Sequence, residues 1–114
     1  KIKNFVVTKS EEKVVYKKIK VISLKNFCKI QKIMRIDFLK VDVEGYEYEV
    51  LKGAKEIIKN VKFIMLEVQK NDMYANYSKN KIENFLKKNN FILIKSFDFP
   101  LMFFKDCIYK KIEN

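Results

Sequence analysis

Apolar positions in this chain fall into short strand-like runs and stretches with helical spacing. Residues 36–43, IDFLKVDV, and 61–68, VKFIMLEV, are apolar at most positions and bounded by charges, a pattern typical of buried strands. Over residues 46–59 apolar side chains recur every three or four positions and give a helix one apolar face. Strand, helix and strand in this order predict a βαβ unit with parallel strands and a right-handed crossover.

The rest of the chain also divides into strands and helices. The further predicted elements are strands over 2–7 and 13–24 around a turn at 8–12, a helix capped by Ser23, a loop at 69–77, a helix capped by Ser78, and strands over 91–97 and 107–112. Residues 97–104, FDFPLMFF, connect the last two strands. We expect this connection to pack on the sheet; an apolar acceptor pocket or a weak lipid contact is the alternative.

Length and composition favour one small globular domain. The chain has 114 residues, of which 48% are hydrophobic and 34% charged, which suffices for a real core. No apolar run approaches the roughly 18 residues of a membrane span, and the first residues lack a secretory signal pattern. We therefore expect a cytoplasmic protein with no membrane span.

The formal net charge of +11 raises the question of a nucleic-acid partner. Only one of the 25 basic residues is an arginine, Arg35, and the lysines are spread along the whole sequence. Reading of base edges and clamping of phosphates favour arginine, so we interpret the lysines as a solvated surface and expect no specific nucleic-acid partner. The absence of histidine excludes imidazole chemistry from this chain, and two glycines exclude a GxGxxG phosphate cradle.

One segment carries a specific motif. Residues 38–54, FLKVDVEGYEYEVLKGA, closely resemble the signature LKxDxEGxExxVLKGA of the FkbM-type methyltransferases. VISLKNF at 21–27 and VKFIMLEV at 61–68 resemble the blocks on either side of that signature, although Lys25 and Asn26 replace its acidic residues. The resemblance covers about residues 20–112.

The resemblance implies an α/β fold: a partial Rossmann-like methyltransferase fold with a mainly parallel sheet and an antiparallel C-terminal strand. It implies S-adenosylmethionine as methyl donor and a small-molecule, glycan or lipid acceptor, methylated on a hydroxyl or carboxyl oxygen. The glycine-rich loop that holds the donor in the full fold is absent from this sequence. We therefore interpret residues 1–114 as a single domain, the C-terminal half of a methyltransferase domain, inactive as an isolated chain.

Three acidic residues are the candidate site. Asp42 and Glu44 follow a strand, point to the same side by alternation, and precede a glycine, Gly45, that permits a sharp turn. In open α/β sheets ligands bind beyond the carboxyl ends of the strands. Asp42 is the predicted catalytic base, Asp42 and Glu44 the predicted contacts to the donor, and Glu67, at the end of the next strand, a predicted acceptor contact. The pair Asp42 and Glu44 could also orient an acceptor hydroxyl or help hold a divalent cation.

Each of these assignments has a structural alternative. For Asp42 the functional interpretation is favoured, because an acidic group inside an apolar strand needs a partner. For Glu44, capping of the following helix is equally favoured, and for Glu67 a solvated strand-end carboxylate is slightly favoured. Glu47 and Glu49 are interpreted as helix-stabilising residues.

Two other functions stay open from the sequence. A truncated methyltransferase fold could act as a binding module, with a homodimer formed through an exposed sheet edge at residues 36–43. A basic binder of nucleic acid or anionic surfaces is the third hypothesis, and it requires lysines gathered on one face.

Overall fold

The computed structural model describes residues 2–10, 13–70 and 78–113. Its elements are β1 (Ile2–Ser10), β2 (Lys13–Lys20), α1 (Leu24–Ile30), β3 (Ile36–Val41), α2 (Glu47–Ala54), the 3-10 helix η1 (Lys55–Asn60), β4 (Val61–Gln69), α3 (Lys79–Lys88), β5 (Phe91–Asp98) and β6 (Phe104–Lys111). The predicted strands and helices are therefore confirmed in kind and order, except that the single helix predicted over 46–59 is two elements, α2 and η1, and several boundaries differ. The predicted loop at 69–77 falls mostly outside the described residues, since only Gln69, the last residue of β4, and Lys70 are described.

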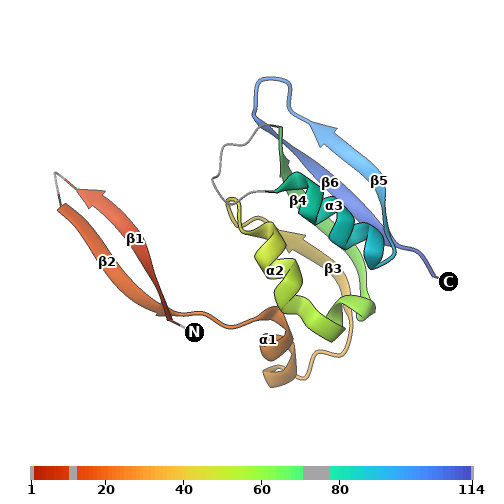
Figure 1. Ribbon diagram of the computed structural model, residues 1–114, viewed down its shortest axis with the longest axis horizontal. Helices are drawn as coiled ribbons and strands as arrows, with labels where there is room; N and C mark the ends of the chain where they lie inside the picture. Colours follow the sequence, from red (N-terminus) through yellow and green to blue (C-terminus); the bar gives the residue numbers. More distant parts are fainter. Residues whose placement is uncertain (1, 11–12, 71–77, 114) are drawn as a thin grey trace.

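The first two strands form a hairpin of their own. β1 and β2 pair antiparallel, with a register irregularity between Val6 and Thr8. Figure 1 shows this two-stranded sheet standing apart from the other elements. The predicted turn at 8–12 is wrong in its first part, because β1 continues to Ser10, and the predicted strand 13–24 ends at Lys20, where residues 21–23 lead into α1.

The main sheet has four strands in the order β3-β4-β6-β5. β3 and β4 are parallel, while β6 is antiparallel to both β4 and β5. Three strands therefore run in one direction and the C-terminal strand runs against them. Because β6 lies between β4 and β5, only the β3–β4 pair is a parallel pairing, and the sheet is mixed rather than parallel throughout.

Helices α2 and α3 cover one face of this sheet (Figure 1). Alternate residues of β4 point into that layer: Ile64, Leu66 and Val68 are buried, as the two-residue period of a strand requires. Leu51 of α2 and Leu86 of α3 meet them in the core. This packing fixes α2, and with it the loop that precedes α2, against the strand ends.

The helical region after that loop is broken where the sequence predicted one helix over 46–59. α2 ends at Ala54, and Lys55 has a φ of 50°, after which η1 continues to Asn60. Gly53 of α2 lies against the start of α1, because a Cβ on Gly53 would lie 3.5 Å from the Cβ of Ser23.

β3 is less buried than the apolar run IDFLKVDV predicts. Val41 is the only buried residue of the strand, and Phe38 keeps 51% of its surface exposed. Within the described part of the chain β3 is an edge strand, and α2 and α3 lie on one face of the sheet only. A run as apolar as this one is typical of a strand covered on both faces of the sheet. The described elements cover β3 on one face and pair it on one side.

Candidate active site

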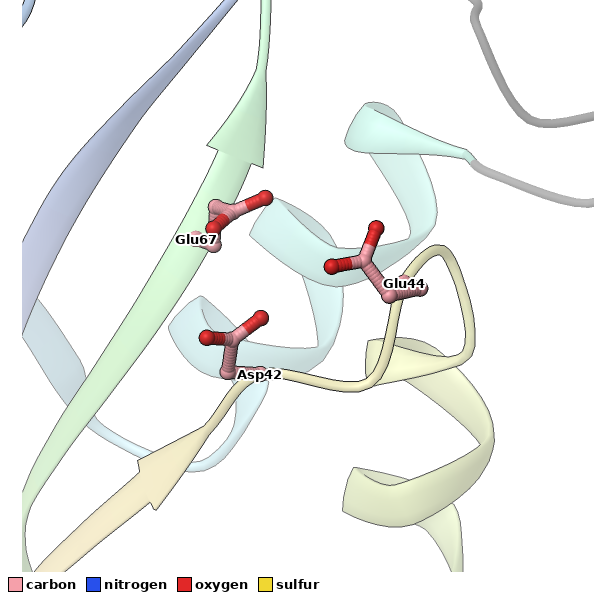
Figure 2. A group of neighbouring side chains, drawn as sticks. All are labelled: Asp42, Glu44 and Glu67. Atoms are coloured by element: carbon pink, nitrogen blue, oxygen red, sulfur yellow. The ribbon is translucent and has the colours of Figure 1, made fainter.

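The three predicted site residues lie together at the carboxyl ends of two adjacent parallel strands. Asp42 directly follows β3, Glu44 lies in the loop between β3 and α2, and Glu67 belongs to β4. The register pairs Val41 with Leu66, which brings Asp42 beside Glu67. One carboxylate oxygen from each residue lies within 4.8 Å of the other two, and Figure 2 shows the side chains converging. The structure thus brings together all three residues that the sequence singled out.

The environment of Asp42 differs from the prediction. Asp42 and Glu44 are exposed and Glu67 is half-buried. Because β3 ends at Val41, Asp42 lies beyond the strand, so the argument that a buried carboxylate needs a partner does not apply to it. The clustering of three carboxylates, and not burial, distinguishes this position from ordinary surface acids.

The loop that carries Glu44 is held in an unusual conformation. Glu44 has a φ of 51° and Gly45 a φ of 98°, so two successive residues are left-handed. The glycine adopts this geometry without strain, whereas the glutamate does so at a cost. Something in the surrounding structure must therefore stabilise the turn.

The side chain of Glu47 stabilises this turn, a role that was not identified from the sequence. The side chain is 1% exposed, and its Oε1 accepts hydrogen bonds from the backbone N–H groups of Val43 and Gly45, each at 3.3 Å. Glu47 was interpreted as a helix-stabilising residue, but its hydrogen bonds are with the loop before the helix. The sequence feature that could have indicated this role is the spacing DxEGxE, in which an acidic residue follows the turn glycine by two positions.

The charges in the cluster oppose one another. Burial raises the pKa of the Glu67 carboxyl, and the negative charges of Asp42, Glu44 and Asp106 raise it further, while a hydrogen bond from Gln69 Nε2 at 2.9 Å lowers it. A positive group placed among the three carboxylates would relieve this repulsion. A sulfonium, an amine or a hard divalent cation, which takes carboxylate oxygens as ligands, would each fit.

We expect Asp42→Asn to lower the pKa of Glu67, since it removes the largest charge contribution to the raised value. A carboxyl with a raised pKa favours the folded state at low pH, and this stability is lost as the pH rises from the unfolded to the folded pKa. As the pH rises, the free energy of unfolding of Asp42→Asn should therefore fall less than that of the unaltered chain. The pKa would be measured from the Glu67 side-chain carbon shifts by NMR.

The matched control is Asp37→Asn. Asp37 is an exposed residue of the same strand, paired with Arg35 at 3.3 Å and located away from the cluster. If both substitutions changed the pKa of Glu67 equally, or if Asp42→Asn did not change it, the carboxylates of Asp42 and Glu67 would not interact.

A large cavity borders the same loop. It has a volume of about 1210 Å³ and lies between residues 20–24, α1 and α2. Its walls are mainly apolar, and the loop contributes Val43 and Tyr46 to them. The segment 42–46 therefore carries two of the three carboxylates, those of Asp42 and Glu44, and also forms part of a cavity wall.

The fold and the cluster together define an α/β domain with three acidic side chains gathered at the carboxyl ends of its two parallel-paired strands, the edge at which open α/β sheets bind ligands. A family model described as the methyltransferase FkbM domain matches residues 2–109, and the chain belongs to this family. The match includes the β1–β2 hairpin, whereas the resemblance seen in the sequence motifs begins at about residue 20. No curated protein and no solved structure matches the chain.

In the described residues no helix is both long enough and apolar enough to span a membrane.

Proposed function

We propose that the chain forms the donor- and acceptor-facing edge of an S-adenosylmethionine-dependent O-methyltransferase. The observation that carries the proposal is the convergence of Asp42, Glu44 and Glu67 at the sheet edge, in a chain that belongs to a methyltransferase family. The acceptor would be a hydroxyl or carboxyl group of a sugar, lipid or other small metabolite.

Bound S-adenosylmethionine would supply an electrophilic methyl group on a positively charged sulfur. Asp42 and Glu44, the two exposed carboxylates, are suited to attract and orient that positive charge. Alignment of donor and acceptor accounts for much of the rate in a displacement of this kind. The loop fixed by Glu47 holds one of these carboxylates in place before the donor arrives.

A carboxylate of the cluster would also take the proton that an alcohol acceptor loses as the new carbon–oxygen bond forms. The sequence favoured Asp42 for this role. We keep Asp42 as the proposed base, and Glu67, whose pKa is raised by burial and by the neighbouring carboxylates, is the alternative.

The open edge of β3 is the second part of the proposal. The exposed Phe38 and the outer edge of β3, which has no neighbour among the described strands, would be covered by a further strand, one that carries the glycine-rich turn absent from this sequence. The donor would then lie between that turn and the acidic cluster. A second copy pairing through β3 is the alternative occupant.

We expect this chain by itself to bind S-adenosylmethionine only at about millimolar concentration, since roughly half of the binding free energy of a micromolar site would be missing. S-adenosylhomocysteine lacks the positive charge on sulfur and should bind about fivefold more weakly, because one ion pair near a solvated surface contributes about 1 kcal/mol. Equilibrium dialysis with both labelled compounds measures the ratio.

The control is again a pair of aspartates. Asp42→Asn should reduce the preference for S-adenosylmethionine over S-adenosylhomocysteine. Asp37→Asn, which removes one partner of the exposed ion pair with Arg35, should leave this preference unchanged. Equal binding of the two compounds to the unaltered chain would contradict the assigned roles, and micromolar binding would show that no further strand is needed.

A further inference from the structure

A second cavity lies at the end of the main sheet opposite the carboxylates. It has a volume of about 1200 Å³ and is formed where β3, β4 and β5 begin and β6 ends. Val61, at this end of β4, and Glu67, in the acidic cluster, are six positions apart, which corresponds to about 20 Å along a strand. The cavity is therefore separate from the site of the proposed reaction.

The fold gathers basic side chains from distant parts of the sequence around this cavity. Two acidic residues line it, Asp37 and Glu113, together with five basic ones: Arg35, Lys59, Lys62, Lys110 and Lys111. The basic residues come from the start of β3, from η1 and the start of β4, and from the end of β6. Although lysines are spread along the sequence, the topology thus brings several of them, and the single arginine of the chain, to one end of the sheet.

Most of this positive charge is not neutralised by neighbouring carboxylates. None of the four lysines forms an ion pair with a carboxylate of the described residues. Arg35 pairs with Asp37 through Nε, at 3.3 Å, and its guanidinium carries four further N–H groups on the two Nη atoms. The cavity can therefore offer several positive charges and N–H donors to one ligand.

Lys111 is the half-buried member of this basic lining. Its Nζ donates a hydrogen bond to the carbonyl of Asn89 at 3.0 Å and lies 4.3 Å from the ring centre of Phe91. Burial lowers the pKa of the Lys111 ammonium, and the positive charge of Lys59 lowers it further. The charges of Lys59 and Lys111 therefore oppose one another, and an anion bound near both would relieve this repulsion.

The spacing of the charges indicates which anion would fit. Neighbouring strands lie about 4.8 Å apart, so Arg35, directly before β3, and Lys110, on β6, belong to backbones about 10 Å apart. Two linked phosphates reach across such a spacing better than one phosphate does. The remaining lining includes exposed apolar side chains, which would contact an organic group attached to the phosphates: Met34, Ile92, Ile94 and Ile112.

From this lining we propose that the basic cavity binds the diphosphate group of a small organic molecule. Lysine supplies a point charge to phosphate oxygens, and arginine supplies a fork of N–H donors that matches them. A nucleoside diphosphate and a prenyl diphosphate share this chemistry and differ in the organic part. The proposal does not depend on methyl transfer, since the cavity and the acidic cluster lie at opposite ends of the sheet.

The test is an NMR titration of the isotopically labelled chain with inorganic phosphate, pyrophosphate, ADP and geranyl diphosphate. At about 0.15 M salt, charges more than about 8 Å apart are largely screened, so contacts in the cavity dominate. We expect amide shifts concentrated in residues 34–37, 59–62 and 110–113, and pyrophosphate should bind about fivefold more tightly than phosphate because it carries more charge. Tighter binding of ADP or of geranyl diphosphate than of pyrophosphate identifies the organic part as aromatic or aliphatic.

A pair of lysine variants separates the cavity from the net charge. Lys110→Gln should weaken pyrophosphate binding about fivefold, because it removes one charge from the lining. Lys18→Gln, at an exposed position of β2, changes the net charge by the same amount and should leave the binding unchanged. Both side chains are exposed, so the fold should persist, which circular dichroism checks.

A pair of acidic variants makes the opposite prediction. Asp37→Asn removes a negative charge from the lining and releases Arg35 from its ion pair, so pyrophosphate should bind about threefold to fivefold more tightly. Glu83→Gln likewise removes one partner of an exposed ion pair, that with Lys79 on α3, and should leave the binding unchanged.

Equal effects within either pair of variants would overturn the proposal, because binding would then follow the net charge alone. Amide shifts confined to other residues, or no binding of pyrophosphate at several millimolar, would also overturn it. If neither ADP nor geranyl diphosphate binds more tightly than pyrophosphate, the organic part of the proposal is wrong. A single-stranded oligonucleotide that binds at the same residues more tightly than ADP would assign the cavity to nucleic acid instead.

Discussion

Glu47→Ala is expected to lower the free energy of unfolding by about 2–4 kcal/mol. The substitution removes the acceptor of two backbone N–H groups, those of Val43 and Gly45, and at least the second of these hydrogen bonds is buried. A hydrogen bond to a charged group contributes about 1.5–3 kcal/mol, and a buried donor left without a partner is costly. Urea denaturation, with the midpoint and slope compared with those of the unaltered chain, measures the loss.

Glu49→Ala is the matched control on the same helix. Glu49 is exposed and pairs with Lys52, three residues further on, at 3.0 Å, so its removal should change stability by less than about 0.5 kcal/mol. Similar losses in the two variants would mean that Glu47 acts through the helix dipole, as any first-turn acid does, and not through the loop.

Leu51→Ala is expected to have an effect of similar or greater size, about 2–5 kcal/mol. Leu51 is fully buried where α2 meets the sheet, and the truncation would leave a cavity in a small core. Since this packing also holds the acidic loop against the strand ends, the variant should loosen the site as well as the fold. Thermal and urea denaturation both measure the loss.

The same substitution at an exposed leucine is the control. Leu101→Ala removes the same atoms from a side chain that is almost fully exposed, and we expect a change within about 0.5 kcal/mol. A loss at Leu101 as large as that at Leu51 would contradict the burial that the structure assigns to the two residues.

The position of the site could be predicted because it depends on local rules. A strand, a glycine turn and a helix were evident in residues 38–54, and alternation placed Asp42 and Glu44 on one side of the chain. Parallel pairing of β3 with β4 then brings the ends of both strands to one edge, which is why Glu67 joins the other two carboxylates. For Glu67, the sequence slightly favoured a solvated carboxylate; the structure makes it the half-buried member of the cluster.

Features that depend on distant neighbours could not be predicted. The exposure of β3 follows from the absence of a neighbour on its outer edge among the described strands, which a window of eight apolar residues does not reveal. The expectation that residues 97–104 pack on the sheet is wrong: Leu101 and Phe103 are exposed, because the turn between β5 and β6 continues beyond the ends of these strands. The role of Glu47 required the left-handed geometry of Glu44 and Gly45, because only that geometry turns two N–H groups toward one carboxylate.

The most direct test of the central claim is a titration of the isotopically labelled chain with S-adenosylmethionine, followed through backbone amide shifts. The method detects millimolar binding, so it suits a site that lacks part of its contacts. We predict that the shifts concentrate in residues 42–47 and 66–69 and weaken in Asp42→Asn. Shifts confined to other segments, or none at concentrations of several millimolar, would contradict the assignment of the acidic edge as the donor site.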